Sequence, residues 1–228
     1  MDLCRFLTAM GGRIRGAGSA AIQVEGVQRL HGADYAPMPD RIVAGTLLCA
    51  GAITGGSIEL TGAPVDDMHA ITAKLREMGC SLHEEGDAIR LDAPARLTAF
   101  PILQTQPHPG FPTDMQAQIC VCMALAGGVS YLTESVYETR FFGYCTELES
   151  MGANIRISNK TATVSGVEKL HGATVCAHDL RAGAALVIAG LAAEGVTYVE
   201  HIHFIERGYE HLIRKLTALG ADIRRLED

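Results

Sequence analysis

Four copies of one short pattern limit what this chain can fold into. The segments FLTAMGGRI, KLREMGCSL, ELESMGANI and KLTALGADI each place a glycine after an amphipathic stretch, at Gly11, Gly79, Gly152 and Gly220. Their separations of 68, 73 and 68 residues indicate a structural unit of about 70 residues. In each copy we expect the glycine to end a helix and an alternating strand to follow it.

A second repeat supports the same unit length. VEGVQRLHGADY at residues 24–35 is matched by VSGVEKLHGATV at residues 164–175, at an offset of 140 residues. This offset corresponds to two units. One unit can be followed through the chain: we predict a helix, a strand, a second helix and two strands at residues 40–54, 56–61, 66–78, 80–84 and 88–92.

The first helix of each unit is apolar almost all round. The three segments are AGTLLCAGAI, MQAQICVCMALAG and RAGAALVIAGLA, and helices of this kind are buried. The strands alternate instead, as in residues 88–92 and 154–158, so one face of each sheet meets solvent. We therefore predict an α/β fold in the form of an inside-out α/β barrel, with buried helices and outer sheets.

Composition excludes several classes of function. The 228 residues carry a net charge of −7 and 48% hydrophobic residues, so we expect a globular chain with neither a nucleic-acid nor a membrane partner. The seven cysteines are scattered, with no CxxC pair, which indicates a reducing, cytoplasmic location. No secretory signal or span-length apolar stretch is recognised. We expect no metal and no cofactor.

The stretch PHPGFPTDMQAQ at residues 107–118 holds one acid stiffly at the start of a predicted helix. Its prolines fix the approach in an extended form. Thr113 and Gln116 have the spacing of a capping box, which places Asp114 in the first turn. One interpretation is that Asp114 only complements the helix dipole. The other is that the rigid loop holds a catalytic acid.

Equivalent acids stand at the starts of all three apolar helices, at Asp40, Asp114 and Asp179, and arginines follow two of them, at Arg41 and Arg181. We expect these helix starts to converge at one end of the domain. Such ends attract anions, although the acids could instead cap their own helices. An aspartate among arginines suits a sugar hydroxyl and a phosphorylated co-substrate, because it supplies a base and guanidinium forks.

Several motifs together resemble one family closely. PHPGFPTDMQAQ, ETRFFG at 138–143, HDLRAGAALVIAGL at 178–191 and ERGYEHLIRKLTALGADI at 206–223 are similar to the UDP-N-acetylglucosamine 1-carboxyvinyltransferases of the enolpyruvyl transferase family. The resemblance covers essentially the whole chain, but only the C-terminal part of the family's chain. The sister 5-enolpyruvylshikimate-3-phosphate synthases share the fold without the PHPGFPTD loop, and such a transferase is an alternative.

The resemblance implies a reaction and roles for particular residues. Enolpyruvate passes from phosphoenolpyruvate to the 3′-hydroxyl of UDP-N-acetylglucosamine in peptidoglycan biosynthesis, and Asp114 matches the general base. Asp179 matches a second acid near the reacting centre. Val136 matches a contact to the UDP-sugar. The arginines matched around phosphoenolpyruvate are Arg140, Arg181 and Arg207.

The family's catalytic cysteine and its phosphate-gripping lysine and arginine have no counterpart here. We therefore interpret residues 1–36 as the trailing half-unit of the N-terminal catalytic-loop domain and residues 37–228 as the three-unit C-terminal domain. The chain alone is expected to be inactive, with a separately encoded N-terminal half as a possible partner; a non-catalytic relic or interaction domain is the alternative. We also hypothesise that residues 20–36 pair with the C-terminal domain and close it.

Two further patterns have simple expectations. His201 and His203 alternate on a predicted strand, but no third ligand with known spacing follows, so a metal site is disfavoured. The residues that precede the four repeat glycines are expected to pack in the core: Met10, Met78, Met151 and Leu219.

Overall fold

The computed structural model describes residues 1–226, and the chain divides into two compact units, Met1–Asp40 and Arg41–Asp228. Within the described residues, no helix combines the length and apolar character that a membrane span requires. The assignment of the first unit to an N-terminal catalytic-loop domain stays a prediction.

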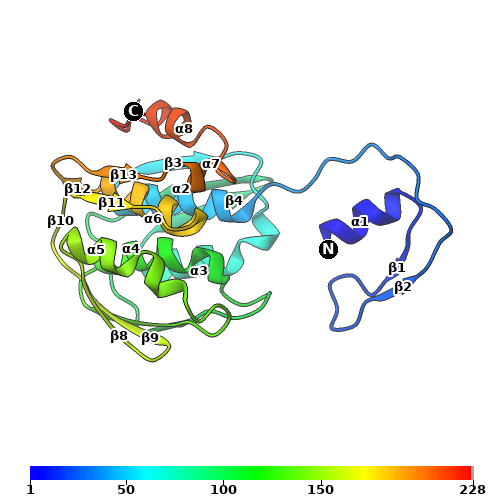
Figure 1. Ribbon diagram of the computed structural model, residues 1–228, viewed down its shortest axis with the longest axis horizontal. Helices are drawn as coiled ribbons and strands as arrows, with labels where there is room; N and C mark the ends of the chain where they lie inside the picture. Colours follow the sequence, from blue (N-terminus) through cyan, green and yellow to red (C-terminus); the bar gives the residue numbers. More distant parts are fainter. Residues whose placement is uncertain (227–228) are drawn as a thin grey trace. The chain divides into compact units, whose positions relative to one another are not determined.

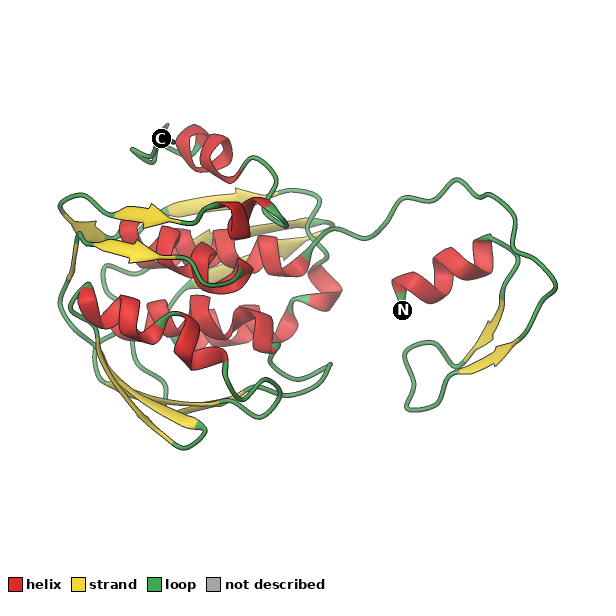
Figure 2. Cartoon of the chain, in the orientation of Figure 1, coloured by secondary structure: helices red, strands yellow, loops and turns green. Residues whose placement is uncertain are grey.

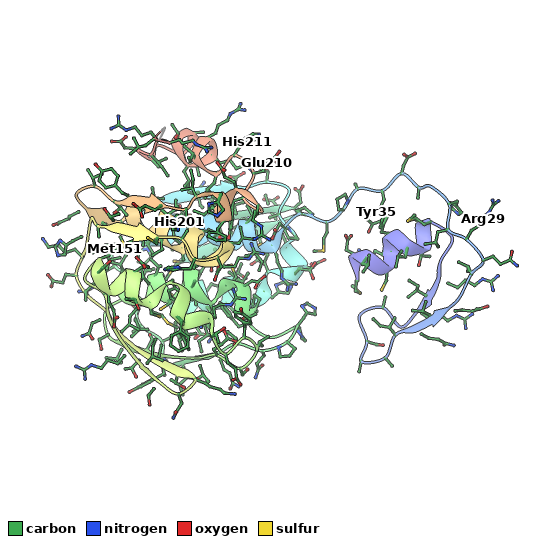
Figure 3. The ribbon with its side chains drawn as sticks, in the orientation of Figure 1. Arg29, Tyr35, Met151, His201, Glu210 and His211 are labelled. Atoms are coloured by element: carbon green, nitrogen blue, oxygen red, sulfur yellow. The ribbon has the colours of Figure 1, made fainter. Side chains whose placement is uncertain are left out.

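The first unit contains a helix and a hairpin: α1 (Asp2–Ala9), β1 (Arg13–Arg15) and β2 (Gln23–Glu25). Tyr35 lies beside α1 (Figure 3), where its ring is 5.2 Å from that of Phe6 and its hydroxyl donates to Asp2 Oδ1 at 2.6 Å. None of its 40 residues is fully buried. The expected strand is present as β2 and pairs antiparallel with β1; the hypothesis that residues 20–36 close the C-terminal domain stays a prediction.

The second unit follows the predicted repeat (Figure 1). Its first part contains α2 (Arg41–Ile53), β3 (Ser57–Leu60), the 3-10 turn η1 (Val65–Asp67), α3 (His69–Glu77), β4 (Ser81–Glu85) and β5 (Ala88–Asp92). The next part contains β6 (Ile102–Gln104), η2 (Thr113–Met115), α4 (Gln116–Leu125), β7 (Val129–Thr133), η3 (Arg140–Gly143), α5 (Cys145–Ser150), β8 (Asn154–Ser158) and β9 (Thr161–Ser165). The last contains β10 (Leu170–His171), β11 (Thr174–Cys176), α6 (Leu180–Leu191), β12 (Ala193–Glu194), β13 (Tyr198–Glu200), α7 (His203–Glu206) and α8 (Leu212–Ala218).

The sheets are small and separate. One has the order β3-β5-β4 with antiparallel pairs, and another has the order β6-β7-β9-β8, in which only β6 and β7 are parallel. Two parallel pairs, β10 with β12 and β11 with β13, complete the set in this unit. Figure 2 shows α2, α4 and α6 between strands on both sides, which is the inside-out arrangement predicted above.

The three apolar helices pack against one another and form the centre of the core. Nine of the ten residues of α4 are buried, and eight residues are buried in each of α2 and α6. Small residues on these helices allow close approach: a Cβ on Gly183 would lie 2.6 Å from the Ile205 side chain. Burial of apolar surface around these helices is the main term that stabilises the unit.

The four repeat glycines end their helices as predicted, with φ angles between 91° and 98°. This left-handed conformation carries no steric penalty at glycine. A strand follows the first three, but no strand is assigned in residues 221–226 after Gly220. The core expectation is therefore only half right. Met78 and Met151 are fully buried, whereas Met10 is half-buried and Leu219 is 54% exposed, because their units offer no complete sheet to cover them.

Candidate functional site

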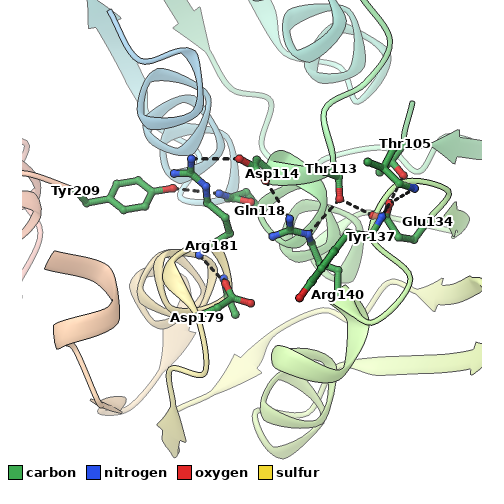
Figure 4. Close-up of polar contacts among 12 residues, drawn as sticks. Thr105, Thr113, Asp114, Gln118, Glu134, Tyr137, Arg140, Asp179, Arg181 and Tyr209 are labelled. Carbon is green, nitrogen blue, oxygen red and sulfur yellow. Dashed lines mark hydrogen bonds and ion pairs between the residues drawn. The ribbon is translucent and has the colours of Figure 1, made fainter. Parts of the chain in front are cut away.

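Asp114 lies between two arginines at the convergence of α4 and α6 (Figure 4). It stands in η2, which begins directly after Pro112. The φ and ψ of Pro112, −71° and 134°, extend the approaching chain. Arg140 Nη2 donates to Asp114 Oδ1 at 3.0 Å, and Arg181 Nη2 donates to Oδ2 at 3.2 Å. The Asp114 side chain is still 39% exposed. A carboxylate offers about four lone-pair directions, so the two arginines leave room for a further donor.

The predicted capping box is not formed. Thr113 makes no cap hydrogen bond; its Oγ1 donates to Glu134 Oε2 at 2.9 Å and accepts from Arg140 Nε at 3.1 Å. Gln116 is buried, and its Oε1 accepts from Tyr144 Oη at 2.7 Å. Hydrogen bonds to charged groups are stronger than bonds to a neutral backbone N–H. The Thr113 hydroxyl therefore bonds these two charged partners and does not bond a backbone N–H of the helix.

Arg140, the first residue of η3, is held on three sides. Besides its bonds to Asp114 and Thr113, its guanidinium lies 4.8 Å from the centre of the Tyr137 ring. The side chain is only 12% exposed. A cation stacked on an aromatic face and bonded through two separate nitrogens has one orientation, so the guanidinium plane is fixed relative to Asp114.

Arg181, the second residue of α6, reaches Asp114 from the opposite side. Its guanidinium carbon is 5.7 Å from the centre of the Tyr209 ring. The Tyr209 hydroxyl lies 2.9 Å from Thr46 Oγ1 and accepts from Gln118 Nε2 at 3.2 Å. Burial raises the pKa of Tyr209 above its ordinary value, which keeps the phenol neutral. The ring is thus a rigid support for Arg181, anchored on α2 and α4.

Asp179 is the N-cap of α6. Its Oδ1 accepts from the backbone N–H groups of Arg181 and Ala182, at 2.7 and 2.8 Å. A Cβ on Gly143 would lie 3.2 Å from Asp179 Oδ2, so the glycine allows the end of η3 to pass close to this carboxylate. The structure therefore gives Asp179 a capping role through Oδ1; its predicted role as a second acid stays a prediction.

Two other predicted site residues stand apart from the ion-paired cluster. Val136 is 45% exposed in the loop between β7 and η3, and its N–H donates to Glu134. Arg207 is exposed at the end of α7. Within residues 1–226 no hydrogen bond or ion pair joins Arg207 to Asp114. The structure therefore unites Asp114, Arg140 and Arg181, with Asp179 at the helix start beside them.

Sequence reasoning missed the residues that support this cluster. Glu134, Tyr209, Gln118 and Thr46 are all buried polar residues. Tyr209, Gln118 and Thr46 lie far apart in the chain from one another, and Glu134 is 21 residues from Thr113. Neither spacing nor composition indicated these contacts. One signal was available: a glutamate directly after the strand residues 129–133, followed by SVYETR, stands close in sequence to Arg140.

No group of three or more His, Cys, Asp or Glu side chains in the described part of the chain is arranged to hold a metal ion. The expected strand placement of His201 is wrong. This residue lies in a turn with φ of 57°, after β13 has ended (Figure 3), and α7 begins at His203. The two rings are 6.1 Å apart between centres.

Taken by its chemistry, the cluster combines one anionic base with two guanidinium groups. The two guanidinium groups outnumber the single carboxylate of Asp114, while Asp179 and Glu134 add carboxylates next to the cluster. The N-termini of α4 and α6 lie in the same region. Such a site can bind an anion through the arginines while the aspartate accepts a proton from a neighbouring hydroxyl.

Known proteins with similar sequences identify the family of this chain. The family model described as EPSP synthase (3-phosphoshikimate 1-carboxyvinyltransferase) matches residues 1–216. The UDP-N-acetylglucosamine 1-carboxyvinyltransferase of Desulfovibrio desulfuricans is 51% identical over 229 positions, covering 99% of this chain and 54% of that protein. The protein of the same name from Myxococcus xanthus is 50% identical, with 98% and 53% covered. The chain thus spans about half the length of the curated relatives it matches.

Two solved structures superpose on the fold of this chain. The enolpyruvyl transferase NikO from Streptomyces tendae superposes with a TM-score of 0.86 at 30% identity, over 98% of this chain and 53% of that one. EPSP synthase from Acinetobacter baumannii gives a TM-score of 0.61 at 21% identity, over 82% and 44%, and this likeness bears on the fold alone.

Proposed function

The chain belongs to the EPSP synthase (3-phosphoshikimate 1-carboxyvinyltransferase) family, and we propose that it is the C-terminal part of a UDP-N-acetylglucosamine 1-carboxyvinyltransferase. In this proposal the complete enzyme, of which this chain is one part, transfers enolpyruvate from phosphoenolpyruvate to the 3′-hydroxyl of UDP-N-acetylglucosamine, for peptidoglycan synthesis. The observation that carries the proposal is Asp114, held in the PHPGFPTD loop with one arginine on each carboxylate oxygen.

The proposed reaction uses both charges of the cluster. Asp114 takes the proton from the sugar hydroxyl as its oxygen forms a bond to the second carbon of phosphoenolpyruvate. Arg140 and Arg181 bind the carboxylate and phosphate of that substrate, because guanidinium forks match both groups. Protonation of the third carbon by an acid of the other domain takes up the electron pair of the carbon–carbon double bond. Loss of a proton from that carbon then re-forms the double bond as the bond between the second carbon and the phosphate oxygen breaks, and inorganic phosphate leaves. Charge that develops during the attack is stabilised without rearrangement, since both arginines are already fixed.

Three further residues have subsidiary proposed roles. Val136 contacts the UDP-sugar, consistent with its exposed place on the loop beside Arg140. Asp179 caps the start of α6 and so holds the backbone of Arg181, and we propose that it acts near the reacting centre in this way. Arg207 is proposed to reach phosphoenolpyruvate, and it precedes by two residues the tyrosine that supports Arg181.

We also propose that these 228 residues do not turn over by themselves. The resemblance places the acid that protonates the third carbon of phosphoenolpyruvate, a cysteine, in the other domain, and none of the seven cysteines matches it. Transition-state stabilisation shared across two domains is lost when one is absent. All seven cysteines here are free thiols, which supports the predicted cytoplasmic location.

Phosphate release from phosphoenolpyruvate and UDP-N-acetylglucosamine tests the proposal. The chain is assayed alone and then as a fusion protein, in which the part of the Desulfovibrio desulfuricans relative that this chain does not cover is joined before Met1. Release by the fusion protein only, lost in Asp114→Asn, supports both parts of the proposal. A folded but inactive fusion protein would favour a non-catalytic relic, and replacement of the sugar by 3-phosphoshikimate tests the sister activity.

A further inference from the structure

A fully buried carboxylate joins four segments around the site. Glu134 follows β7 and is 0% exposed. Its Oε1 accepts from Thr105 Oγ1 at 2.6 Å and from two backbone N–H groups, those of Val136 at 2.8 Å and Tyr137 at 2.9 Å. Its Oε2 accepts from Thr113 Oγ1 at 2.9 Å. The end of β6, the proline-rich loop, the end of β7 and the loop before η3 therefore meet on one side chain (Figure 4).

The directions of these hydrogen bonds are fixed by their donors. A guanidinium nitrogen can only donate, so Thr113 Oγ1 accepts from Arg140 Nε and must send its own proton to Glu134. On the other side, the Ser135 N–H donates to Thr105 Oγ1 at 3.0 Å, which leaves the Thr105 proton for Glu134. All four bonds thus run toward the carboxylate. A buried carboxylate needs such donors to offset its lost hydration.

Glu134 reaches Arg140 by two routes. One runs through Thr113, whose oxygen holds Arg140 Nε at 3.1 Å. The other runs through the backbone of Tyr137, whose ring lies 4.8 Å from the guanidinium carbon of Arg140. The Thr113 hydrogen bond positions the Nε side of the Arg140 guanidinium, and the Tyr137 ring positions the plane of the group. Arg140 Nη2 is then directed at Asp114 Oδ1.

We propose that Glu134 is a positioning residue that sets Arg140 against the base Asp114 and holds the Val136 backbone toward the sugar side of the site. Glu134 itself touches no substrate. The expected effect of Glu134 on turnover rests on the proposed function. Its effect on the position of Arg140 does not, and it can be measured in the isolated 228-residue chain. The proposal predicts different effects for the two residues. Loss of the Thr113 hydroxyl removes one donor from Glu134 and disturbs Arg140, but it leaves the bonds from Glu134 to the Val136 and Tyr137 backbone. A change at Glu134 disturbs Arg140 and the Val136 backbone together.

The first test uses nuclear magnetic resonance on the ¹⁵N-labelled 228-residue chain. The Nε–H signal of Arg140 is assigned by its loss in Arg140→Lys, and its exchange with water is followed. We expect Thr113→Val to speed this exchange about tenfold, the effect of one charge-assisted hydrogen bond. Thr113→Ser keeps the hydroxyl and should keep the slow exchange.

Thr72→Val is the matched control. Thr72 is fully buried, whereas Thr113 is half-buried, and like Thr113 it accepts from an arginine, Arg76 Nη1 at 3.3 Å; it lies on α3 outside the site. Its replacement should leave the Arg140 signal unchanged. Equal exchange rates at Arg140 in the original chain and in Thr113→Val would overturn the proposal.

The second test measures turnover in the fusion protein. Thr113→Val should lower kcat about tenfold with little change in KM for UDP-N-acetylglucosamine, and Thr113→Ser should restore kcat. Glu134→Gln should lower kcat and also raise that KM. The proposal fails if Thr113→Val costs no more than Thr72→Val. An inactive unmodified fusion protein would count against the proposed function, while the exchange rates still decide whether Glu134 positions Arg140.

Discussion

Asp114 and Asp179 stand at equivalent places in successive repeats but make opposite kinds of contact. Asp179 turns Oδ1 back onto its own helix, where it accepts two backbone N–H groups. Asp114 makes no cap bond, and each of its oxygens receives an arginine from a different element. One repeat position therefore supplies a helix cap in one unit and an ion-paired carboxylate in another.

The local backbone explains the difference. Asp179 is extended, with φ and ψ of −151° and 175°, which is the conformation in which an N-cap side chain reaches the next N–H groups. Asp114 lies inside the 3-10 turn η2, two residues ahead of the start of α4. One added turn after a proline thus moves an aspartate off its helix and toward the site.

The largest expected effect is the loss of activity on Asp114→Asn. An amide keeps the size of the side chain but cannot accept a proton as a base, so phosphate release by the fusion protein should fall by about 10²–10⁴-fold. Urea unfolding of the same variant is the control. If Asp114→Asn lost activity only because less of the protein was folded, the result would contradict a catalytic role for Asp114 that Asp179 does not share.

Arginine-to-lysine changes come next. Lysine keeps the charge but lacks the planar fork whose separate nitrogens bond Asp114 and Thr113, so Arg140→Lys should lower kcat/KM by about 10–100-fold. Arg181→Lys should have a similar effect, because it loses its place over the Tyr209 ring. Steady-state kinetics on the fusion protein measure both. Arg90→Lys is the matched control, because Arg90 forms an exposed ion pair with Asp92 on β5. This change should alter neither kcat nor KM.

A smaller effect is expected on stability at Asp179. Asp179→Ala removes both cap bonds and should lower the free energy of unfolding by about 1 kcal/mol. Asp179→Ser should recover most of this, since serine also caps helices. Urea titration of the chain followed by circular dichroism measures the difference. No change in Asp179→Ala would mean that the cap contributes nothing to folding.

Pro112→Ala should have the smallest effect. Proline already fits the observed φ of −71°, so its removal mainly frees the unfolded chain and should cost roughly 0.4–1 kcal/mol. Ala substitution at Pro101, which lies on an exposed segment away from η2, provides a comparison at a second proline. A tenfold loss of turnover in Pro112→Ala without loss of stability would show that rigidity of the loop itself serves the reaction.

Features with a local cause could be predicted from the sequence. The repeat glycines and the apolar helices depend on spacing and on neighbouring residues alone, so Gly79 ends α3 and α4 is buried as expected. The loop pattern and the repeat indicate Asp114 and Arg181, the resemblance adds Arg140, and the structure brings these three together.

The supporting polar contacts could not be predicted, because their partners are distant in the chain. Thr113 fits a capping box when only residues 113–116 are considered, yet its partners lie 21 and 27 residues away. Glu134 resembles an ordinary polar residue at the end of a strand, although it is completely buried. Leu219 carries the same repeat signal as Met151 but is exposed, since burial also depends on a neighbouring sheet.

The most direct test of this account places serine at both aspartates in the fusion protein and compares phosphate release. Serine can cap a helix but cannot act as a carboxylate base. Asp179→Ser should therefore keep activity within about tenfold of the unmodified fusion protein, whereas Asp114→Ser should lose at least about 100-fold. Equal losses in the two variants would contradict the account, because both aspartates would then share the same chemistry.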